Sequence, residues 1–465
     1  MTKQNEIHGW QAWFFEFRRF LHPQSIVLLL LGFSAGLPFL LISGTLSAWL
    51  QESGLDYKSI GFFAWVGLAF SIKFFWAPFV DQLRFPFLCK WLGQRRGWLL
   101  AAQAGICFGL FWMSSLAPAA QPGLLALIAV FVAFCAATQD VCVDAYRIQA
   151  CDEDMQGVVT TSYIAGYRLA LLMSGAGALF IAEGYGWAWS YKVMGILVGV
   201  GMITVLWMKE PALIVQSVIS SKANATWIDK ILRWCWRNIL DPFAEMVQRF
   251  GGFFLLLILV VLFYRVSDIA MGNMANPFYL ALAYTKTDIA WVTKIFGLVM
   301  VLAGSAIGGL MVARQGLFRS MLLCLFSVIL TNLLFSALAV VGASCLNIVG
   351  ECESPSLVWL GFVISADNIA AGASNVVFIA FLSSQVNLQY SATQYALLSS
   401  LMTFLGKFIS GFSGIMVESF GFSWFFIYVS CLGLPSLLLL SALRYWRPSC
   451  FETRSNVGPR NLNDE

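Results

Sequence analysis

The feature that most constrains this chain is a series of apolar segments, each about 20 residues long, which recur along almost its entire length. A helix of that length spans the ~30 Å hydrocarbon layer of a membrane and satisfies its own backbone hydrogen bonds there. Of the 465 residues, 59% are hydrophobic and 11% are charged, whereas charged residues make up about 25% of a soluble domain. The sequence therefore predicts an all-α polytopic membrane protein.

About twelve transmembrane helices fit between the charged and Gly/Pro-containing breaks of the sequence. In the first half they are predicted at 25–50, 58–80, 97–117, 123–146, 157–182 and 187–208. In the second half they are predicted at 252–282, 287–313, 319–342, 356–384, 392–417 and 422–444. An even number of helices places both ends of the chain on the same side of the membrane.

The longest interruption, 209–250, is basic and amphipathic, as expected of a helix that lies on an anionic membrane surface. It separates two halves that resemble each other weakly, because both GTLSAWLQESGLDYKSIGFFAWVG and MANPFYLALAYTKTDIAWVTKIFG read as helix, short outer loop and helix. We expect an interfacial segment (1–24), a six-helix bundle (25–208), a linker (209–250), a second six-helix bundle (251–444) and a tail (445–465). Two six-helix halves with pseudo-twofold symmetry resemble the layout of major facilitator transporters.

Lysine and arginine residues gather in alternate loops, and this bias predicts the orientation of the chain. They are concentrated near the N-terminus, in the 81–96 loop, in the central linker and in the tail. The opposite loops contain only Lys58 and Lys286 as basic residues. Both termini and the linker are therefore expected on the cytoplasmic side.

The 11 cysteines are scattered through apolar segments without a CxxC pair or a Cys/His cluster. Most are expected to be packing residues, and no metal site is predicted. Cys345 and Cys352 share a short polar loop on the outer side, where they can either form a disulfide or stay reduced. The net charge of +4 is small and does not indicate a nucleic-acid surface.

Motifs for catalysis or phosphate binding do not stand out in this sequence. GxGxxG and Walker-type loops and HExxH are absent, and both histidines, His8 and His22, lie near the N-terminus. We therefore predict that the protein is not an enzyme and uses no bound cofactor. If it moves a solute uphill, a proton gradient rather than ATP is expected to supply the energy.

Several charged residues fall inside predicted helices, where each costs about 2.5–3.5 kcal/mol on insertion scales. Such residues normally face a partner or a water-filled cavity. In the fourth predicted helix, Asp140 and Asp144 share one face, and Arg147 follows one turn after Asp144. These charges are the first candidates for function.

The seventh predicted helix also contains charges. Arg265 and Asp268 are three residues apart, and Asn273, Asn276 and Pro277 follow them. Polar residues around a proline predict a broken helix end that lines a cavity.

A rough acid and base pair is predicted in each half. Asp140 is followed in the next helix by Arg168, and Asp367 of the tenth helix is followed in the eleventh by Lys407. Asp140, Asp268 and Asp367 are candidate proton-coupling sites, because a carboxylate in a cavity can load and release a proton as access alternates. Permanent ion pairing and direct solute contact are the alternatives for each of them.

Candidate solute-binding residues are the polar and aromatic side chains near these charges: Lys73, Tyr163, Tyr167, Arg168, Tyr264, Arg265, Asn368, Asn375 and Lys407. For the lysine of the second helix, the alternative is that its ammonium group snorkels to the membrane surface. For the three tyrosines, the alternative is ordinary packing.

A second group of charges is predicted at the cytoplasmic ends of the helices. Asp144 and Arg147 lie near the loop that carries Asp81, Arg95 and Arg96. We expect these five residues to form a structural or gating charge relay.

Five long blocks of the sequence are similar to the AmpG-type muropeptide permeases of bacterial inner membranes. The blocks are LGFSAGLPFLLISGTLSAWL, WAPFVDQLR…GQRRGWLLA, ATQDVCVDAYR, GYRLALLMSGAGALFIAEGYGW and YSATQYALLSSLMTFLGKF. The resemblance covers both halves. It implies a proton-driven importer that returns anhydro-muropeptides to the cytoplasm for peptidoglycan recycling.

The resemblance also carries over individual charged positions. By matching blocks, the family's charges correspond to Lys73, Asp140, Asp144, Arg168 and Asp268. Asp367 stands where a glutamate is expected, and Lys407 where an arginine is expected. The implied partners are a glycopeptide-like solute and the lipid bilayer, with no nucleic acid and no obligatory protein partner. Import of another bulky polar solute, such as a siderophore, is the alternative function.

Overall fold

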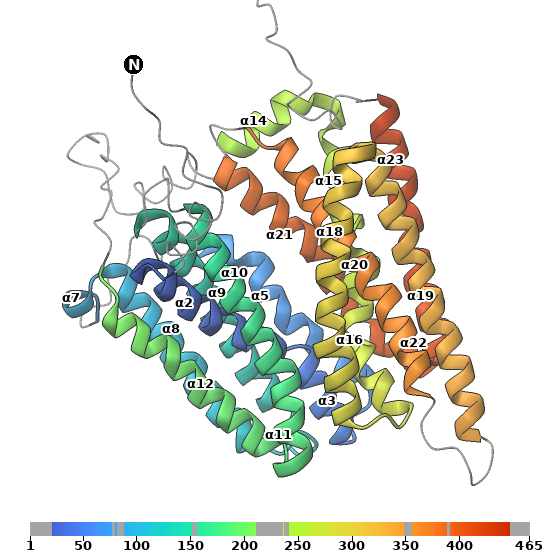
Figure 1. Ribbon diagram of the computed structural model, residues 1–465, viewed down its shortest axis with the longest axis horizontal. Helices are drawn as coiled ribbons and strands as arrows, with labels where there is room; N and C mark the ends of the chain where they lie inside the picture. The colour runs from blue at the N-terminus through green and yellow to red at the C-terminus, as the bar shows by residue number, and fades with distance from the viewer. Residues whose placement is uncertain are drawn as a thin grey trace, which may run out of the picture. The chain divides into compact units, whose positions relative to one another are not determined.

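A computed structural model of the protein describes residues 21–76, 80, 88–150, 156–210, 236, 241–347, 356–387 and 391–446. The regular structure of these residues is helical (Figure 1). Most of the interfacial segment, linker and tail predicted from the sequence lies outside the described residues.

Ten of the described helices are long and apolar enough to cross a membrane. They are Pro23–Glu52, Gln94–Ser114, Pro122–Arg147, Val158–Tyr185, Trp187–Trp207, Phe243–Ala281, Lys286–Gln315, Leu317–Gly342, Leu357–Gln385 and Ser413–Trp446. Two shorter apolar helices, Tyr57–Ile72 and Leu397–Ser410, lie where the sequence predicts the second and eleventh helices. The prediction of an all-α polytopic membrane protein with about twelve helices is confirmed.

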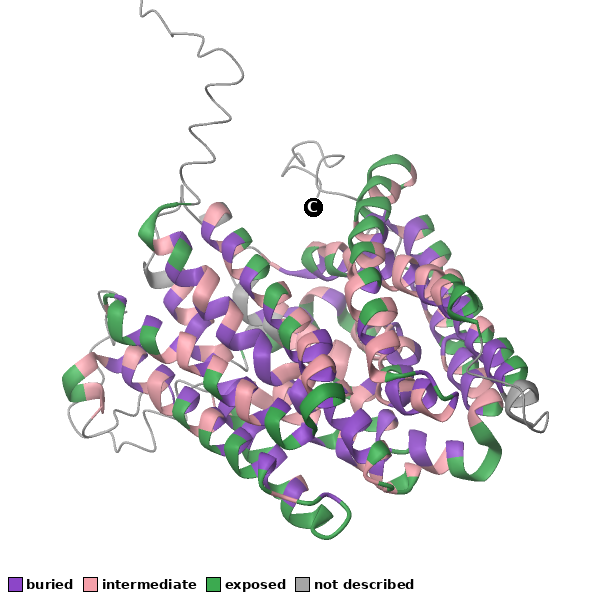
Figure 2. Ribbon diagram, turned by 60° about the horizontal axis from the view of Figure 1, so that its bottom comes forward, coloured by how far each residue is buried: buried purple, intermediate pink, exposed green. Residues whose placement is uncertain are grey.

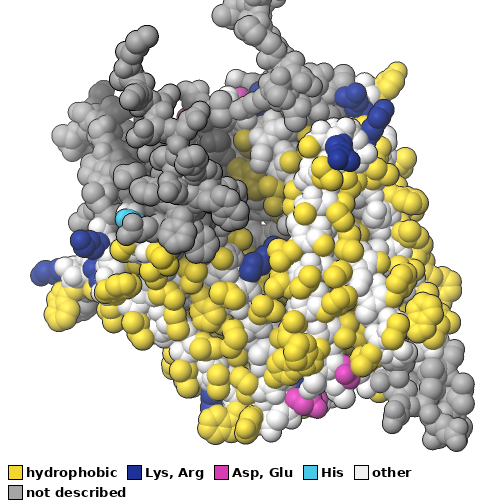
Figure 3. All heavy atoms as spheres, viewed as in Figure 1, with side chains coloured by type: hydrophobic (Ala, Val, Ile, Leu, Met, Phe, Trp, Pro, Cys, Tyr) yellow, Lys and Arg dark blue, Asp and Glu magenta, His cyan; other side chains and the backbone are white. Residues whose placement is uncertain are grey.

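Large apolar side chains are exposed along these helices. Leu127 is 66% exposed, Ile203 69% and Val358 79%. Buried and exposed residues lie on different faces of the same helices (Figure 2), and hydrophobic side chains cover much of the described surface in Figure 3. Because a soluble protein rarely exposes contiguous apolar surface of this extent, these faces are suited to contact with lipid.

The chain divides into two compact units. Unit 1 comprises Met1–Ile42, Phe75–Ala117 and Gln121–Ala223, and unit 2 comprises Ser43–Phe74, Pro118–Ala120 and Asn224–Glu465. Unit 2 therefore contains the end of the first predicted helix and most of the second. The sequence-based division into bundles at 25–208 and 251–444 stays a prediction.

Unit 1 is built around two helices that pack backbone against backbone. Its elements are α2 (Pro23–Leu41), α7 (Leu88–Leu92), α8 (Gln94–Ser114), α9 (Pro122–Ala150), α10 (Gln156–Leu172), the π-helix η4 (Met173–Gly177), α11 (Ala178–Tyr185) and α12 (Trp187–Trp207). In the seam between α2 and α10, a Cβ on Gly32 would lie 2.2 Å from the Tyr163 carbonyl oxygen. A Cβ on Gly166 would lie 1.9 Å from the Leu29 carbonyl oxygen. Glycine at these positions allows the close approach that the GFSAGLP motif predicts.

Unit 2 has a similar seam. Its elements are α3 (Gly44–Glu52), α4 (Tyr57–Phe63), η1 (Ala64–Gly67), α5 (Leu68–Ile72), α14 (Asp241–Phe250), η6 (Gly251–Phe253), α15 (Phe254–Phe263), α16 (Val266–Ala281), α17 (Lys286–Ile289), the π-helix η7 (Ala290–Phe296), α18 (Gly297–Gln315), α19 (Leu317–Asn347), α20 (Leu357–Gln385), α21 (Ser391–Ser410), α22 (Ser413–Leu432) and α23 (Leu434–Trp446). Between α18 and α20, a Cβ on Gly304 would lie 2.2 Å from the Ile369 carbonyl oxygen, and one on Gly372 would lie 2.3 Å from that of Val301.

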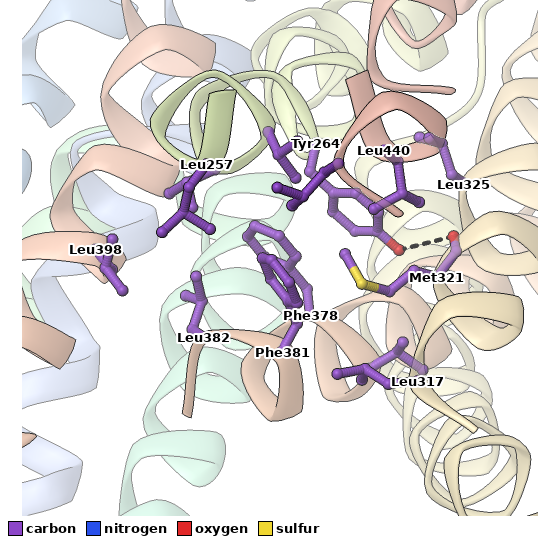
Figure 4. Packing of buried hydrophobic residues seen from close by; sticks show 14 of the residues in the cluster. Leu257, Tyr264, Leu317, Met321, Leu325, Phe378, Phe381, Leu382, Leu398 and Leu440 are labelled. Carbon is purple, nitrogen blue, oxygen red and sulfur yellow. Dashed lines mark hydrogen bonds between the residues drawn. The ribbon is translucent and has the colours of Figure 1, made fainter. Parts of the chain in front are cut away.

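A hydrophobic core of unit 2 lies against α20, one of the two helices of this seam (Figure 4). Leu257 of α15, Phe378 and Phe381 of α20, and Leu440 of α23 are fully buried in it. The ring of Tyr264 stacks on that of Phe378 with centroids 4.3 Å apart. This packing fixes α15 and α20 relative to each other.

A hairpin formed by residues 44–72 packs on α16, α21 and α22 within unit 2. Three side chains donate to backbone carbonyl oxygens across this contact: Asn276 to Gly44, Asn273 to Ile60 at 3.1 Å, and Trp65 to Phe408 at 3.0 Å. An ion pair joins Lys286 Nζ to Glu52 Oε1 at 2.8 Å. The 44–72 hairpin is therefore held by polar contacts as well as by apolar packing.

The predicted break at Pro277 is wrong. Helix α16 continues through Pro277 to Ala281, and the span bends instead at Arg265, where φ is −107° and ψ is 7°. A proline removes one backbone donor, and a helix in a membrane tolerates that loss where its neighbours satisfy the released groups. The bend occurs where a charged pair, Arg265 and Asp268, interrupts the apolar run.

Candidate functional site

The bend between α15 and α16 places an ion pair inside the apolar part of unit 2. The guanidinium of Arg265 pairs with the carboxylate of Asp268, and the two side chains are 17% and 22% exposed. Arg265 Nη1 also donates to Asn375 Oδ1 of α20 at 2.7 Å. Because Asp268 lies in the first turn of α16, the helix dipole also favours its negative charge.

A second carboxylate lies close to this pair. Asp367 of α20 interacts electrostatically with Asp268, and its Oδ1 lies 3.3 Å from Thr331 Oγ1 of α19. The same Thr331 hydroxyl lies 3.0 Å from the Val328 carbonyl oxygen. Since a hydroxyl has one hydrogen, it cannot donate fully to both acceptors at once. A protonated Asp367 can donate to Thr331 Oγ1 and leave the threonine hydrogen on Val328.

The two predicted asparagines of α20 have different surroundings. Asn375 accepts from Arg265, as described above, and thereby orients the guanidinium. Asn368 Nδ2 donates to the Ile364 carbonyl oxygen of its own helix at 3.0 Å. It also lies against α18, where a Cβ on Gly297 would come within 2.9 Å of Asn368 Nδ2.

Tyr264 lies in the hydrophobic core of unit 2. Its side chain is 3% exposed, and its hydroxyl donates to the Met321 carbonyl oxygen at 3.1 Å (Figure 4). In this structure Tyr264 packs as its alternative expects, and solute contact by Tyr264 stays a prediction. A polar tip on an aromatic ring is satisfied here by the main chain.

Two predicted lysines lie where α5 packs on α21. Lys407 Nζ donates to Ser71 Oγ at 3.4 Å and lies 5.5 Å from the centre of the Phe70 ring. Ser71 Oγ is 2.8 Å from Thr403 Oγ1. Lys73 begins the short 3-10 helix η2 (Lys73–Phe75) directly after α5, and both lysines are half-buried.

In unit 1, the charges of α9 meet the tyrosines of α10. Asp140 interacts electrostatically with the hydroxyl groups of Tyr163 and Tyr167, and the two rings are 6.3 Å apart. The guanidinium of Arg147 lies 5.9 Å from the Tyr163 ring centre. Arg168 interacts electrostatically with Tyr167. The structure therefore places five of the predicted residues of unit 1 in one polar group.

The predicted charge relay is only partly described. Asp144 Oδ1 lies 3.6 Å from Arg147 Nη2, and the side chains of Asp144 and Arg147 are 48% and 26% exposed. Asp81 lies outside the described residues. The relay stays a prediction.

Arg95 and Arg96 contact a residue that the prediction missed, Glu210. Its Oε1 accepts from the backbone N–H of Arg95 at 2.8 Å, and its Oε2 accepts from that of Arg96 at 3.1 Å. The side chain of Arg96 donates to the carbonyl oxygens of Val205 and Leu206, both at 2.8 Å. Glu210 thus caps the positive end of α8, and Arg96 caps the negative end of α12. The side chain of Arg96 is therefore engaged in helix capping.

Sequence reasoning also missed Lys294 and Thr331. Lys294 lies in η7, and its Nζ donates to Asn276 Oδ1 at 3.2 Å. A lysine within an apolar run is a signal that the sequence does contain. The hydroxyl of Thr331 gave no such signal, because threonine is frequent in membrane helices and its acidic partner lies in another helix.

The prediction of a disulfide remains open. Cys352 lies outside the described residues, and the side chain of Cys345 is not described. Among the residues that are described, no group of three or more His, Cys, Asp or Glu side chains has the geometry of a metal site.

The sequence matches the family model of the Major Facilitator Superfamily over residues 28–411, which is most of the chain. The chain belongs to the Major Facilitator Superfamily. Two curated relatives place it more narrowly. A protein of Rickettsia felis assigned to the AmpG transporters is 32% identical over 89% of this chain and 95% of its own length. The anhydromuropeptide permease of Escherichia coli K12 is 31% identical over 92% of this chain and 81% of its own length. The resemblance to AmpG-type permeases is confirmed.

Solved structures of the superfamily share the fold of this AmpG-type protein. A peptide transporter of the POT type, in complex with sulfate, superposes with a TM-score of 0.67 at 9% identity, covering 92% of this chain and 96% of its own. A D-xylose-proton symporter superposes with a TM-score of 0.65 at 12% identity, covering 90% of this chain and 97% of its own. This superfamily member is a multi-pass membrane transporter.

Proposed function

We propose that this transporter imports anhydro-muropeptides across the bacterial inner membrane, driven by a proton gradient and by alternating access of one central site. The observation that carries the proposal is 31% identity to an anhydromuropeptide permease over 92% of the chain. The curated relatives favour this solute over the siderophore alternative. The basic loops of the sequence further support an orientation with both termini in the cytoplasm.

Proton coupling is assigned to Asp367, with Asp268 and Asp140 as further candidates. Asp367 interacts electrostatically with Asp268, and the Thr331 hydroxyl can accept a hydrogen bond from its protonated carboxyl group. Asp268 is already paired with Arg265, so its charge is compensated. In this mechanism, Asp367 binds a proton from the outer side together with the solute and releases it on the inner side. Asp268 keeps its contact with Arg265 throughout this cycle in the proposal.

Uptake by the purified protein in proteoliposomes tests the proposal. Radiolabelled anhydro-muropeptide is added outside, with and without an inward proton gradient, and empty liposomes serve as the control. We expect faster uptake and accumulation above the outside concentration only when the gradient is present. An imposed gradient of about one pH unit supports about tenfold accumulation for one proton per solute.

Two outcomes would contradict different parts of the proposal. The absence of uptake under both conditions would reject the muropeptide as the solute. Equal uptake with and without the gradient would reject proton coupling and retain the solute. Uptake by the purified protein alone would support the expectation that no protein partner is required.

A further inference from the structure

Lys294 lies deep within the span Lys286–Gln315. Lys286, eight residues earlier, forms an ion pair with Glu52 next to the loop that joins α16 to α17. Eight helical residues advance the chain by about 12 Å, whereas half of the hydrocarbon layer is about 15 Å thick. Lys294 is therefore close to the middle of the membrane, the depth at which secondary transporters bind their solutes.

The local backbone around Lys294 is unusual. Residues Ala290–Phe296 form a π-helix between α17 and α18. Such segments are rare and occur frequently at functional sites, because the extra residue per turn redirects the side chains. The preceding turn is fixed by a capping box, in which Thr285 and Asp288 bond to each other's backbone N–H groups.

The ammonium group of Lys294 has unused donor capacity. Among the described residues, Asn276 Oδ1 at 3.2 Å is its hydrogen-bond acceptor, and no carboxylate lies within ion-pairing distance. An ammonium group carries three N–H donors. Lys294 as a whole residue is half-buried, so part of it is exposed in this structure.

The orientation of Asn276 is determined by its second contact. Asn276 Nδ2 donates to the carbonyl oxygen of Gly44, so the amide oxygen must be the atom that points to Lys294. Asn276 itself is 2% exposed. A neutral amide oxygen orients the ammonium group without neutralising its charge. A positively charged group thus stands at mid-membrane, oriented from one side and without a negative partner among the described residues.

We propose that Lys294 binds a carboxylate group of the transported solute. A carboxylate supplies both the missing negative charge and acceptors for the remaining N–H groups, and such charge-assisted bonds are stronger than neutral ones. The inference rests on the proposed function, because an anhydro-muropeptide carries carboxylates on its peptide. The inference adds to the proposed function one specific contact, between Lys294 of unit 2 and a peptide carboxylate of that solute.

Two probes and three variants test this contact. The probes are an anhydro-muropeptide with free peptide carboxylates and the same molecule with those carboxylates amidated. The variants are Lys294→Gln, Lys294→Arg and the control Lys192→Gln. Lys192 lies at the start of α12 with its ammonium 5.1 Å from the exposed Trp189 ring, so its substitution removes one charge far from Lys294 in the sequence. Binding constants of the purified proteins are measured by isothermal titration calorimetry.

We expect Lys294→Gln to bind the free-carboxylate probe about 10- to 100-fold more weakly than the wild type. The wild type should lose a similar factor when the probe is amidated, and Lys294→Gln should then bind the amidated probe as well as the wild type does. Lys294→Arg should retain a preference for the free carboxylate. Lys192→Gln should match the wild type with both probes.

Equal losses with both probes would overturn the proposal, because they would mean that Lys294 serves only to hold Asn276. If Lys294→Gln does not fold, as judged by size-exclusion chromatography, the wild type and Lys294→Arg decide: no preference for the free carboxylate in either protein rejects the contact. Failure of the wild type to bind either probe would instead reject the proposed solute, and the inference with it.

Discussion

The seam between α2 and α10 in unit 1 and the seam between α18 and α20 in unit 2 are built in the same way but hold their charges differently. In both, glycines let one backbone touch the carbonyl oxygens of the other. In unit 1 the acid Asp140 belongs to a third helix and meets tyrosines of the seam. In unit 2 the acid Asp367 belongs to a seam helix itself.

This comparison distinguishes a feature of helix packing, which both units share, from the surroundings of the acids, which differ between the units. The seams are equivalent, so the close approach of the helices is a property of both units. The acids are not equivalent, because Asp367 lies beside the Thr331 hydroxyl and interacts with an acid of another helix, Asp268, whereas Asp140 interacts with the hydroxyl groups of Tyr163 and Tyr167. We therefore expect substitutions in the two seams to have equal effects, and substitutions of the two acids to have unequal effects.

The largest change in the free energy of unfolding is expected when a glycine in a seam is replaced by alanine, which adds a Cβ atom there. On Gly308 it would lie 2.7 Å from the Ala373 carbonyl oxygen, whereas the adjacent Gly309 has nothing within 4 Å. Gly308→Ala should destabilise the protein by about 3 kcal/mol through overpacking, and Gly309→Ala should be neutral or stabilise it by about 0.5–1 kcal/mol. Thermal unfolding in detergent, followed by fluorescence, measures both.

The same pair of tests in unit 1 checks whether the seams are equivalent. Gly32→Ala should behave like Gly308→Ala, and Gly184→Ala, where nothing lies within 4 Å, should behave like Gly309→Ala. If Gly32→Ala leaves the stability unchanged, the two seams are not equivalent, because only the unit 2 seam would then be under steric constraint.

Substitutions in the ion pair of unit 2 are expected to lower the stability of the protein by an intermediate amount. Arg265→Gln leaves Asp268 and Asp367 facing each other without a cation, so it should cost about 2 kcal/mol of stability. Asp268→Asn should cost less, because it also removes the repulsion between the carboxylates. The double variant should recover most of the loss, and the coupling is read from the unfolding midpoints of all four proteins. Strictly additive losses would show that the pair does not act as a unit.

Substitution of the two acids, Asp367 and Asp140, is expected to involve the smallest free energy of the three tests, although it has the largest consequence for transport. In proteoliposomes with a gradient of about one pH unit, Asp367→Asn should lower solute accumulation about tenfold, to the outside concentration, which corresponds to about 1.4 kcal/mol. Exchange of solute across the membrane without a gradient should continue. Asp140→Asn should retain part of the accumulation. Identical losses of driven uptake in both variants would remove the distinction between the two acids.

The helices could be predicted from sequence because length and apolarity alone decide whether a segment spans a membrane. The predicted ranges 187–208 and 356–384 correspond closely to α12 and α20. The sequence predicts a break at Pro277 rather than the bend at Arg265, since a proline is the usual local signal for a break and an ion pair is not. The local sequence pattern therefore predicts where the helices lie, but it does not predict every bend within them.

The site was less predictable because its contacts join distant segments. Asp367 and Arg265 were recognisable as charges in an apolar context, but Thr331 became relevant only through its distance to Asp367. Lys294 and Asn276 are 18 residues apart, on separate helices, and no periodicity relates them. The grouping of residues 43–74 with unit 2 depends on tertiary contacts of the same long-range kind.

The 44–72 hairpin has a consequence for how relatives of this chain can diverge. Asn273, Asn276 and Trp65 donate to main-chain oxygens, and every residue type supplies such an oxygen. Substitution at the acceptor positions therefore leaves these three hydrogen bonds available, whereas substitution of a donor removes one. A chimera that exchanges the acceptor segments between distant relatives should keep the contact, provided that the three donor side chains are inherited together.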